Sequence, residues 1–332
     1  MFRKKNPPAI GVDIGTASVK VMEMTGSRGE YRVERFAVEP LPRNVVVENA
    51  ITDIDRVGKT IRAAVERAGT RRTHAVAAVS AARAISKVVN VPGGLTGDDL
   101  EQQVEIEAEH YIPYSIAEVN VDFEVLAPSV ENPANDEVML AACRKDIVEE
   151  RAAALEAAGL KPSVIEINSL ANQRAFELIA PSLPDAGADK VVAIVDYGTT
   201  SSHLYVLARG RLIYHRDYPF GGKTLTESIQ RRFGISFSEA ESKKRSGELP
   251  ENYRKDLLEP FVESMAVEAN RAIQLFISST QFSGVDYVFV TGGSAALPGA
   301  VEHISEKTGI TARVAYPFSG ARLPVPTFPR IV

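Results

Sequence analysis

The sequence has little cysteine, no tryptophan and no surplus of basic residues. A single cysteine, Cys143, excludes an internal disulfide and a cysteine-ligated metal site, and it indicates a reducing compartment. Basic residues number 38 against 43 acidic ones, which argues against a general nucleic-acid binder. No apolar run reaches the roughly 18 residues of a spanning helix, and the basic first residues precede no apolar signal stretch. We therefore expect a cytoplasmic protein that binds no nucleic acid and does not insert into a membrane.

What is present is an ordinary globular composition and an internal repeat. The 332 residues, 45% of them hydrophobic, suit about two domains. Residues 10–24 align without a gap on residues 193–207, and each copy reads strand, Asp-x-Gly-Thr turn, strand. The identical pairs are Val12/Val195, Asp13/Asp196, Gly15/Gly198, Thr16/Thr199 and Ser18/Ser201. Two copies half a chain apart predict two similar domains.

Strands and helices alternate around the two copies, which predicts an α/β architecture. Between residues 84 and 167 the order is β-α-β-β-α-β, typical of a split βαβ subdomain inserted into the first domain. We expect a first domain at 8–83 with 160–184, the inserted subdomain at 84–159, a second domain at 185–223 with 281–318, and a helical subdomain at 224–280. Four prolines within the last sixteen residues predict an irregular tail at 319–332.

The two Asp-x-Gly-Thr turns are the first candidate binding feature. Glycine lets the backbone approach a ligand, and the N–H groups and hydroxyls that follow can hold phosphate oxygens. One such turn alone is more often a plain hairpin, but two in register favour a clamp on a polyphosphate. Asp13 and Asp196 would then face a hydrated Mg²⁺. Lys20 would lie at a phosphate or, alternatively, in solvent, and the second copy has His203 in its place.

A third glycine-rich turn follows an apolar strand late in the chain. Gly292, Gly293 and Ser294 could pass close to a flat ligand such as adenosine, although a tight structural turn is an equal alternative. Residues 220–224 end like a Walker A loop, but Asp217 stands where its first glycine would be, which excludes a P-loop. The histidines lack metal-ligand spacing, although a hairpin could bring His203 near His215.

Together these features resemble the nucleotide fingerprint of the actin-like ATPase superfamily. Within it the sequence is similar to the PilM family of type IV pilus assembly, over about residues 8–318. The segments that carry this likeness are Glu105–Tyr114, Val121–Glu124, Leu140–Lys145, Phe220–Gly222 with Leu225–Arg232, and Gln281–Tyr287. The fold implied is the actin-like ATPase fold, with two duplicated RNase H-like domains and an inserted subdomain of the 1C type. The sequence departs from the family after Phe318, where members usually continue with a Gly- and Ala-rich helix.

The resemblance also implies a site for ATP and Mg²⁺. Its first phosphate loop comprises Asp13, Gly15, Thr16, Ala17, Ser18 and Lys20, and its second comprises Asp196, Gly198, Thr199, Thr200 and Ser201. Its remaining residues are Gly221 and Gly222, the adenosine loop Gly292, Gly293 and Ser294, and the pair Glu241 and Lys244 beside ribose and adenine. Mg²⁺ would face Asp13 and Asp196 through water.

The function implied is that of a cytoplasmic scaffold held at the inner membrane by a partner. PilM-like proteins bind the cytosolic N-terminal tail of PilN in a groove bordered by the inserted subdomain, and they connect the alignment complex to other inner-membrane and motor components. Self-association stays open. The sequence assigns no general base, Glu166 and Asn172 being weak candidates, so a weak ATPase is the most that is expected.

Three alternatives remain at this stage. A small-molecule kinase of the same fold would need an aspartate base and a sugar-sized pocket, neither of which the sequence locates. A filament former of the FtsA type at the membrane normally carries a terminal amphipathic helix, which the proline-rich end does not offer. A degenerate fold without nucleotide is disfavoured because both phosphate loops are intact.

Overall fold

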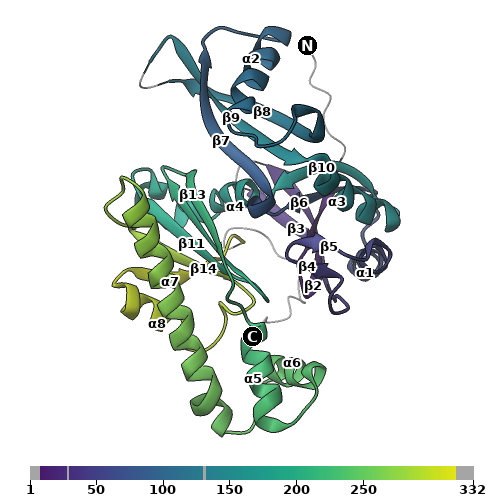
Figure 1. Ribbon diagram of the computed structural model, residues 1–332. Coiled ribbons are helices and arrows are strands. Elements are labelled where there is room, and N and C mark those ends of the chain that lie inside the picture. Colours follow the sequence, from purple (N-terminus) through teal and green to yellow (C-terminus); the bar gives the residue numbers. More distant parts are fainter. Residues whose placement is uncertain (1–7, 28–29, 130–131, 319–332) are drawn as a thin grey trace. The chain divides into compact units, whose positions relative to one another are not determined.

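Figure 1 shows the computed structural model, which describes residues 8–27, 30–129 and 132–318. The chain divides into two compact units: unit 1 is Met1–Glu23 with Arg35–Ala171, and unit 2 is Met24–Glu34 with Asn172–Val332. The finer division into subdomains stays a prediction. Among the described residues, no helix combines the length and the apolar character that crossing a membrane requires. The predicted irregular tail at 319–332 lies outside the described residues.

Two five-stranded sheets share one strand order, as the sequence repeat predicts. The first sheet runs β10-β6-β1-β2-β3 and the second, from its other edge, β15-β14-β11-β12-β13. In both, the opening strand pairs antiparallel with the next strand and parallel with a later one. The first sheet comprises β1 (Ala9–Ile14), β2 (Ser18–Ser27), β3 (Glu30–Pro40), β6 (His74–Val79) and β10 (Lys161–Ile167). The second comprises β11 (Val191–Tyr197), β12 (Ser202–Ala208), β13 (Arg211–Tyr218), β14 (Tyr287–Gly292) and β15 (Thr311–Val314).

The first sheet is covered by α1 (Ile54–Ala68) and α3 (Lys145–Ala157), which pack against each other. Helix α1 begins at Asp53, whose carboxylate accepts a hydrogen bond from the Arg56 N–H, and ends at Gly69 in the left-handed conformation. Its apolar residues recur at helical spacing, so one stripe is buried in the core. A short hairpin of β4 (Val46–Val47) and β5 (Ala50–Ile51) precedes it.

The inserted region forms a small antiparallel sheet of its own, in the order β7-β9-β8 (Figure 1). Its strands are β7 (Ala84–Pro92), β8 (Val119–Pro128) and β9 (Asn135–Arg144), and α2 (Asp98–Glu109) buries Val104 and Ala108 in its core. The predicted six-element block therefore differs in its last two elements. Strand β10 pairs with β6, and α3 buries Ala154 and Leu155 in the core of the first sheet. The apolar face of α3 decides this placement, because it matches the larger core.

The second sheet is covered on both faces. Helix α7 (Glu259–Ser279) buries a stripe against one face together with α5 (Lys223–Phe233), α6 (Phe237–Ser246) and α8 (Ala300–Thr308). On the other face lies Phe176, from α4 (Asn168–Phe176). Its ring packs edge-on against that of Phe289, with the ring centres 6.2 Å apart. Short helical turns lie at Ala81–Arg83, Ile116–Glu118, Ala180–Ser182, Pro184–Gly187 and Arg254–Leu258. Burial on both faces explains the continuous apolar runs of β11 and β14.

The contact between α1 and α3 leads to a stability prediction. A Cβ atom added to Gly58 would lie only 2.6 Å from the Cβ of Ala157. A helical Gly→Ala change usually stabilises by about 1 kcal/mol, but overpacking costs about 1–3 kcal/mol. We expect Gly58→Ala to lower the free energy of unfolding in urea. Adding Ala157→Gly should relieve part of that loss, whereas two independent, additive effects would show that the helices do not clash here.

Candidate functional site

The first Asp-x-Gly-Thr turn joins β1 to β2 in the predicted hairpin. The Gly15 N–H donates to the Ser18 carbonyl at 3.1 Å, and the carbonyl of Ala17 accepts a hydrogen bond from Leu41. Asp13 and Lys20 lie opposite each other in the register, and Lys20 Nζ donates to Asp13 Oδ2 at 2.6 Å. Both side chains are about half exposed, so this ion pair contributes only about 0–1 kcal/mol. A phosphate and a cation could therefore separate the pair at low cost.

The second turn, between β11 and β12, repeats the first. The Gly198 N–H donates to the Ser201 carbonyl at 3.0 Å, and Asp196 lies opposite His203. A Cβ atom at Gly198 would come within 2.7 Å of the Ser201 carbonyl oxygen, against 3.2 Å for the matching contact at Gly15. The turn therefore leaves less room for a side chain in unit 2 than in unit 1.

Three glycine-containing turns meet in unit 2. The N–H groups of Gly222 and Lys223 donate to the carbonyls of Gly198 and Thr199, at 3.0 and 2.8 Å. A Cβ atom at Gly221 would lie 2.8 Å from the Gly198 carbonyl oxygen. We call this arrangement the glycine cradle and include in it Gly198, Thr199, Gly221, Gly222, Gly292 and Ser294.

The third turn closes against the other two. A Cβ atom at Gly222 would lie 2.9 Å from Ser294 Oγ, and one at Gly292 would lie 2.5 Å from Asp196 Oδ1. Gly292 also has a φ of 87°, which favours glycine. At Gly293 an added Cβ meets open space, so no steric contact requires that glycine. The cradle thus brings together backbone from the second turn, β14 and the start of α5, with the Ser294 hydroxyl and the Asp196 carboxylate beside the glycines.

Glu241 and Lys244 lie on α6 and are joined to α5 by buried Thr226. Lys244 Nζ donates to Glu241 Oε2 at 2.8 Å and to Thr226 Oγ1 at 2.7 Å, and the Thr226 hydroxyl donates to Glu241 Oε2 at 2.7 Å. Burial raises the pKa of Glu241, but Lys244 foremost, then Thr226 and Arg245, outweigh it and hold the pKa below its ordinary value. The carboxylate is therefore ionised and fixed. The sequence did not predict the contacts that Thr226 and Arg245 make with Glu241, since these depend on the packing of α5 and α6 and on the helical turn of α6.

A second polar chain lies beside the cradle, and the sequence analysis also missed it. His203 Nδ1 lies 2.7 Å from Asp217 Oδ1, and His203 Nε2 lies 3.3 Å from Ser201 Oγ. The strand register places Asp217 opposite His203, whereas His215 lies opposite Tyr205, so the two histidines do not face each other. Burial lowers the pKa of His203, but the hydrogen bond and charge of Asp217, and then the charge of Asp196, raise it above 6.5.

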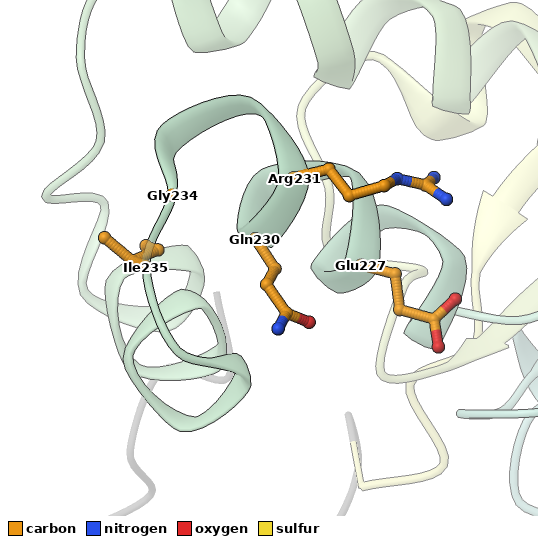
Figure 2. Close-up of a pocket in the computed structure, with 5 residues that line it drawn as sticks. All are labelled: Glu227, Gln230, Arg231, Gly234 and Ile235. Carbon is orange, nitrogen blue, oxygen red and sulfur yellow. The ribbon is translucent and has the colours of Figure 1, made fainter.

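A hollow of about 640 Å³ also opens on unit 2, along α5 and the turn that follows it (Figure 2). Its lining residues are Glu227, Gln230, Arg231, Gly234 and Ile235. Glu227 is paired with Lys223 at 3.6 Å, and Arg231 donates to Ser228 at 3.3 Å, so both charges are engaged by their own helix. The hollow contains none of the residues predicted for nucleotide binding.

Apart from Glu241 and Lys244 on α6, the structure places the residues predicted for nucleotide binding in two groups. Asp13, Gly15, Thr16, Ala17, Ser18 and Lys20 form the turn in unit 1. Within unit 2, the cradle brings the second turn together with Gly221, Gly222, Gly292 and Ser294. Of the two weak candidates for a general base, Glu166 lies on β10 and Asn172 on α4.

The His203–Asp217 pair makes unit 2 sensitive to pH. Because the folded-state pKa of His203 is raised above 6.5, the pair stabilises the fold fully below pH 6.5 and loses that contribution as the pH rises through the folded-state value. We expect the difference in unfolding free energy between the unchanged protein and His203→Gln to shrink between about pH 6 and pH 8. Urea titrations at several pH values measure it. Asp217→Asn should reduce this pH dependence, because it removes the main cause that raises the pKa of His203, and a gap independent of pH would contradict the assignment.

Comparison with known proteins bears out this fold. Residues 11–327 match the family described as type IV pilus assembly protein PilM. A solved PilM–PilN type IV pilus biogenesis complex is 25% identical, with a TM-score of 0.77, over 96% of this chain and 90% of that chain.

Two more distant structures share the fold alone. The ethanolamine utilization protein EutJ from Carboxydothermus hydrogenoformans is 19% identical, with a TM-score of 0.56, over 94% of this chain and 86% of its own. MreB 5 of Spiroplasma citri, solved with AMPPNP, is 13% identical, with a TM-score of 0.50, over 94% and 92%. Because the family match spans nearly all of the sequence and the duplicated sheets agree with it, the chain belongs to the PilM family of type IV pilus assembly proteins and has the actin-like ATPase fold.

Proposed function

We propose that the protein is an ATP-binding scaffold of type IV pilus assembly, which binds the cytosolic tail of PilN and links it to the motor components. The glycine cradle in unit 2 carries the nucleotide part of this proposal. Family membership and the likeness to a PilM–PilN complex support the pilus part, and they favour a scaffold over a small-molecule kinase or an FtsA-like filament former. The protein would be cytoplasmic and held at the inner membrane through its partner.

The residues present fit a nucleotide with its metal. In the cradle, glycines let the three turns approach closely, and turns of this kind, with their N–H groups and the Thr and Ser hydroxyls, can hold phosphate oxygens. The positive end of the eleven-residue α5 begins there, at Gly222, without a capping side chain. Lys20 would hold a phosphate, Glu241 and Lys244 would hold the nucleoside, and Asp13 and Asp196 would orient hydrated Mg²⁺. The metal supplies charge neutralisation when it is bound.

Partner binding is assigned to the inserted sheet and its helix. Near the end of α2, Tyr111 and Tyr114 are 38% and 49% exposed, and Ile106 is 47% exposed. Lys87 Nζ lies 3.8 Å from the centre of the Tyr111 ring, and the Arg144 guanidinium carbon lies 5.5 Å from that of Tyr114. Exposed aromatic rings held by cations can receive apolar side chains of an extended peptide.

Nucleotide binding is tested at the two aspartates. Asp13→Asn and Asp196→Asn should each weaken Mg²⁺-dependent ATP binding about 10-fold or more, because each removes a charge that faces the metal. Titration calorimetry with and without Mg²⁺ measures this. Asp55→Asn, in the first turn of α1, is the matched control and should bind normally. Unchanged affinity in both site variants would refute the proposal.

Partner binding is tested at the exposed aromatics, since a deletion of the whole block would also remove α3 from the first core. Tyr114→Ala, and Tyr111→Ala with it, should weaken binding of a PilN tail peptide about 10-fold or more, because aromatic anchors dominate interfaces. Fluorescence anisotropy with a labelled peptide gives the affinity. Val267→Ala, at an exposed position on α7, should leave it unchanged. Full affinity in the double tyrosine variant would place the docking site elsewhere.

A further inference from the structure

The chain Asp217–His203–Ser201 has the connectivity of a nucleophilic triad. An ionised carboxylate can only accept hydrogen bonds, so the 2.7 Å contact with Asp217 assigns the ring hydrogen to Nδ1 of His203. When the ring is neutral, at a pH above its folded-state pKa, Nε2 presents its lone pair toward the Ser201 hydroxyl, 3.3 Å away. A base that contacts a hydroxyl, and is itself oriented by a third group, is the arrangement that activates a serine. Such contacts are often long before a substrate binds.

The hydrogen bond between Ser201 and His203 is not needed to hold the turn. Two other hydrogen bonds already close the turn. The Gly198 N–H donates to the Ser201 carbonyl, and the Ser202 hydroxyl donates to the Phe220 carbonyl at 2.6 Å. The His203 side chain is 12% exposed and that of Asp217 is 24% exposed, whereas Ser201 is only half-buried. All three side chains are therefore partly buried, and the base and its orienting group are largely shielded from solvent.

The first copy of the repeat provides an internal comparison. There, Lys20 occupies the place of His203 and donates its hydrogen bond to Asp13. A protonated lysine has no lone pair with which to accept a proton from Ser18. The triad therefore belongs to the second turn only, although the two turns share their backbone geometry.

We propose that Ser201 is a nucleophile, activated by His203 and Asp217, and that it accepts the γ-phosphoryl group of ATP bound at the second turn. Ser201 Oγ bonds to the γ-phosphorus, and its proton passes to His203 Nε2. The bond from that phosphorus to the β–γ bridging oxygen breaks, its electron pair stays on the oxygen, and ADP leaves. The product is phosphoserine at 201. This step rests on the proposed nucleotide binding, and it adds a negative charge to the second turn.

The nucleophile can be tested without nucleotide. Diisopropyl fluorophosphate reacts with activated serines, forming an Oγ–P bond and releasing fluoride. We expect it to label Ser201, as peptide mass spectrometry would locate, and Ser201→Ala to remove the label. His203→Gln and Asp217→Asn should slow labelling by roughly 10²-fold or more. His215→Gln is the control: His215 lies on β13, the strand of Asp217, but opposite Tyr205. Ser201 in this variant should be labelled at the normal rate. No label on Ser201, or a rate indifferent to His203→Gln, would overturn the proposal.

Phosphoryl transfer is tested with γ-labelled ATP and Mg²⁺ on the full chain, with binding measured in the same samples. We expect labelled phosphate to appear on Ser201. Ser201→Ala should abolish this labelling, and His203→Gln should slow it. The protein could bind ATP and yet acquire no label, or release inorganic phosphate as the only product. Either result would refute the phosphoryl transfer but not the activated serine. A protein that reacts with the fluorophosphate but does not bind ATP would refute the proposed nucleotide function and the transfer with it, and would leave the nucleophile standing.

Discussion

The close approach of three backbone turns in unit 2 is the constraint on which the candidate site depends. Gly198, Gly221 and Gly292 leave no space for side chains where the turns touch, and hydrogen bonds from the start of α5 fix their spacing. Because α5 is tied to α6 through Thr226, the position of Glu241 and Lys244 depends on the same contact. One backbone arrangement therefore sets the geometry of both the phosphate and the nucleoside parts of the proposed site.

The duplicated turns share a backbone but differ in their charges. In unit 1 an aspartate pairs with a lysine across two strands, and the pair is exposed and weak. In unit 2 the matching histidine turns to a carboxylate on the third strand, is largely buried, and contacts a serine. The first turn thus presents a partly exposed lysine paired with Asp13, whereas the second presents a largely buried hydrogen-bond chain. The two turns share one backbone hydrogen-bond pattern, and single side chains distinguish what each can do.

The inserted sheet depends on a different principle. It has its own core and helix, yet α3, which follows it directly, packs in the core of the first sheet. A partner that binds the inserted sheet therefore acts on a region connected at both ends to the first sheet, through β7 and α3. Coupling between such a region and a bound nucleotide would typically amount to about 1–3 kcal/mol.

The sequence by itself determined the two hairpins with their Asp-x-Gly-Thr turns, the α/β class and the family, because turn chemistry, strand alternation and a gapless repeat are local and readable in order. It also supplied Glu241 and Lys244 through family likeness. Only the tertiary structure decided that α3 joins the core of the first sheet, since matching apolar faces outweigh order along the chain. The tertiary structure alone brought Asp217 into contact with His203, and Thr226 into contact with Glu241. Strand register and helix packing join these residues, and their spacing in the sequence gives no sign of contact.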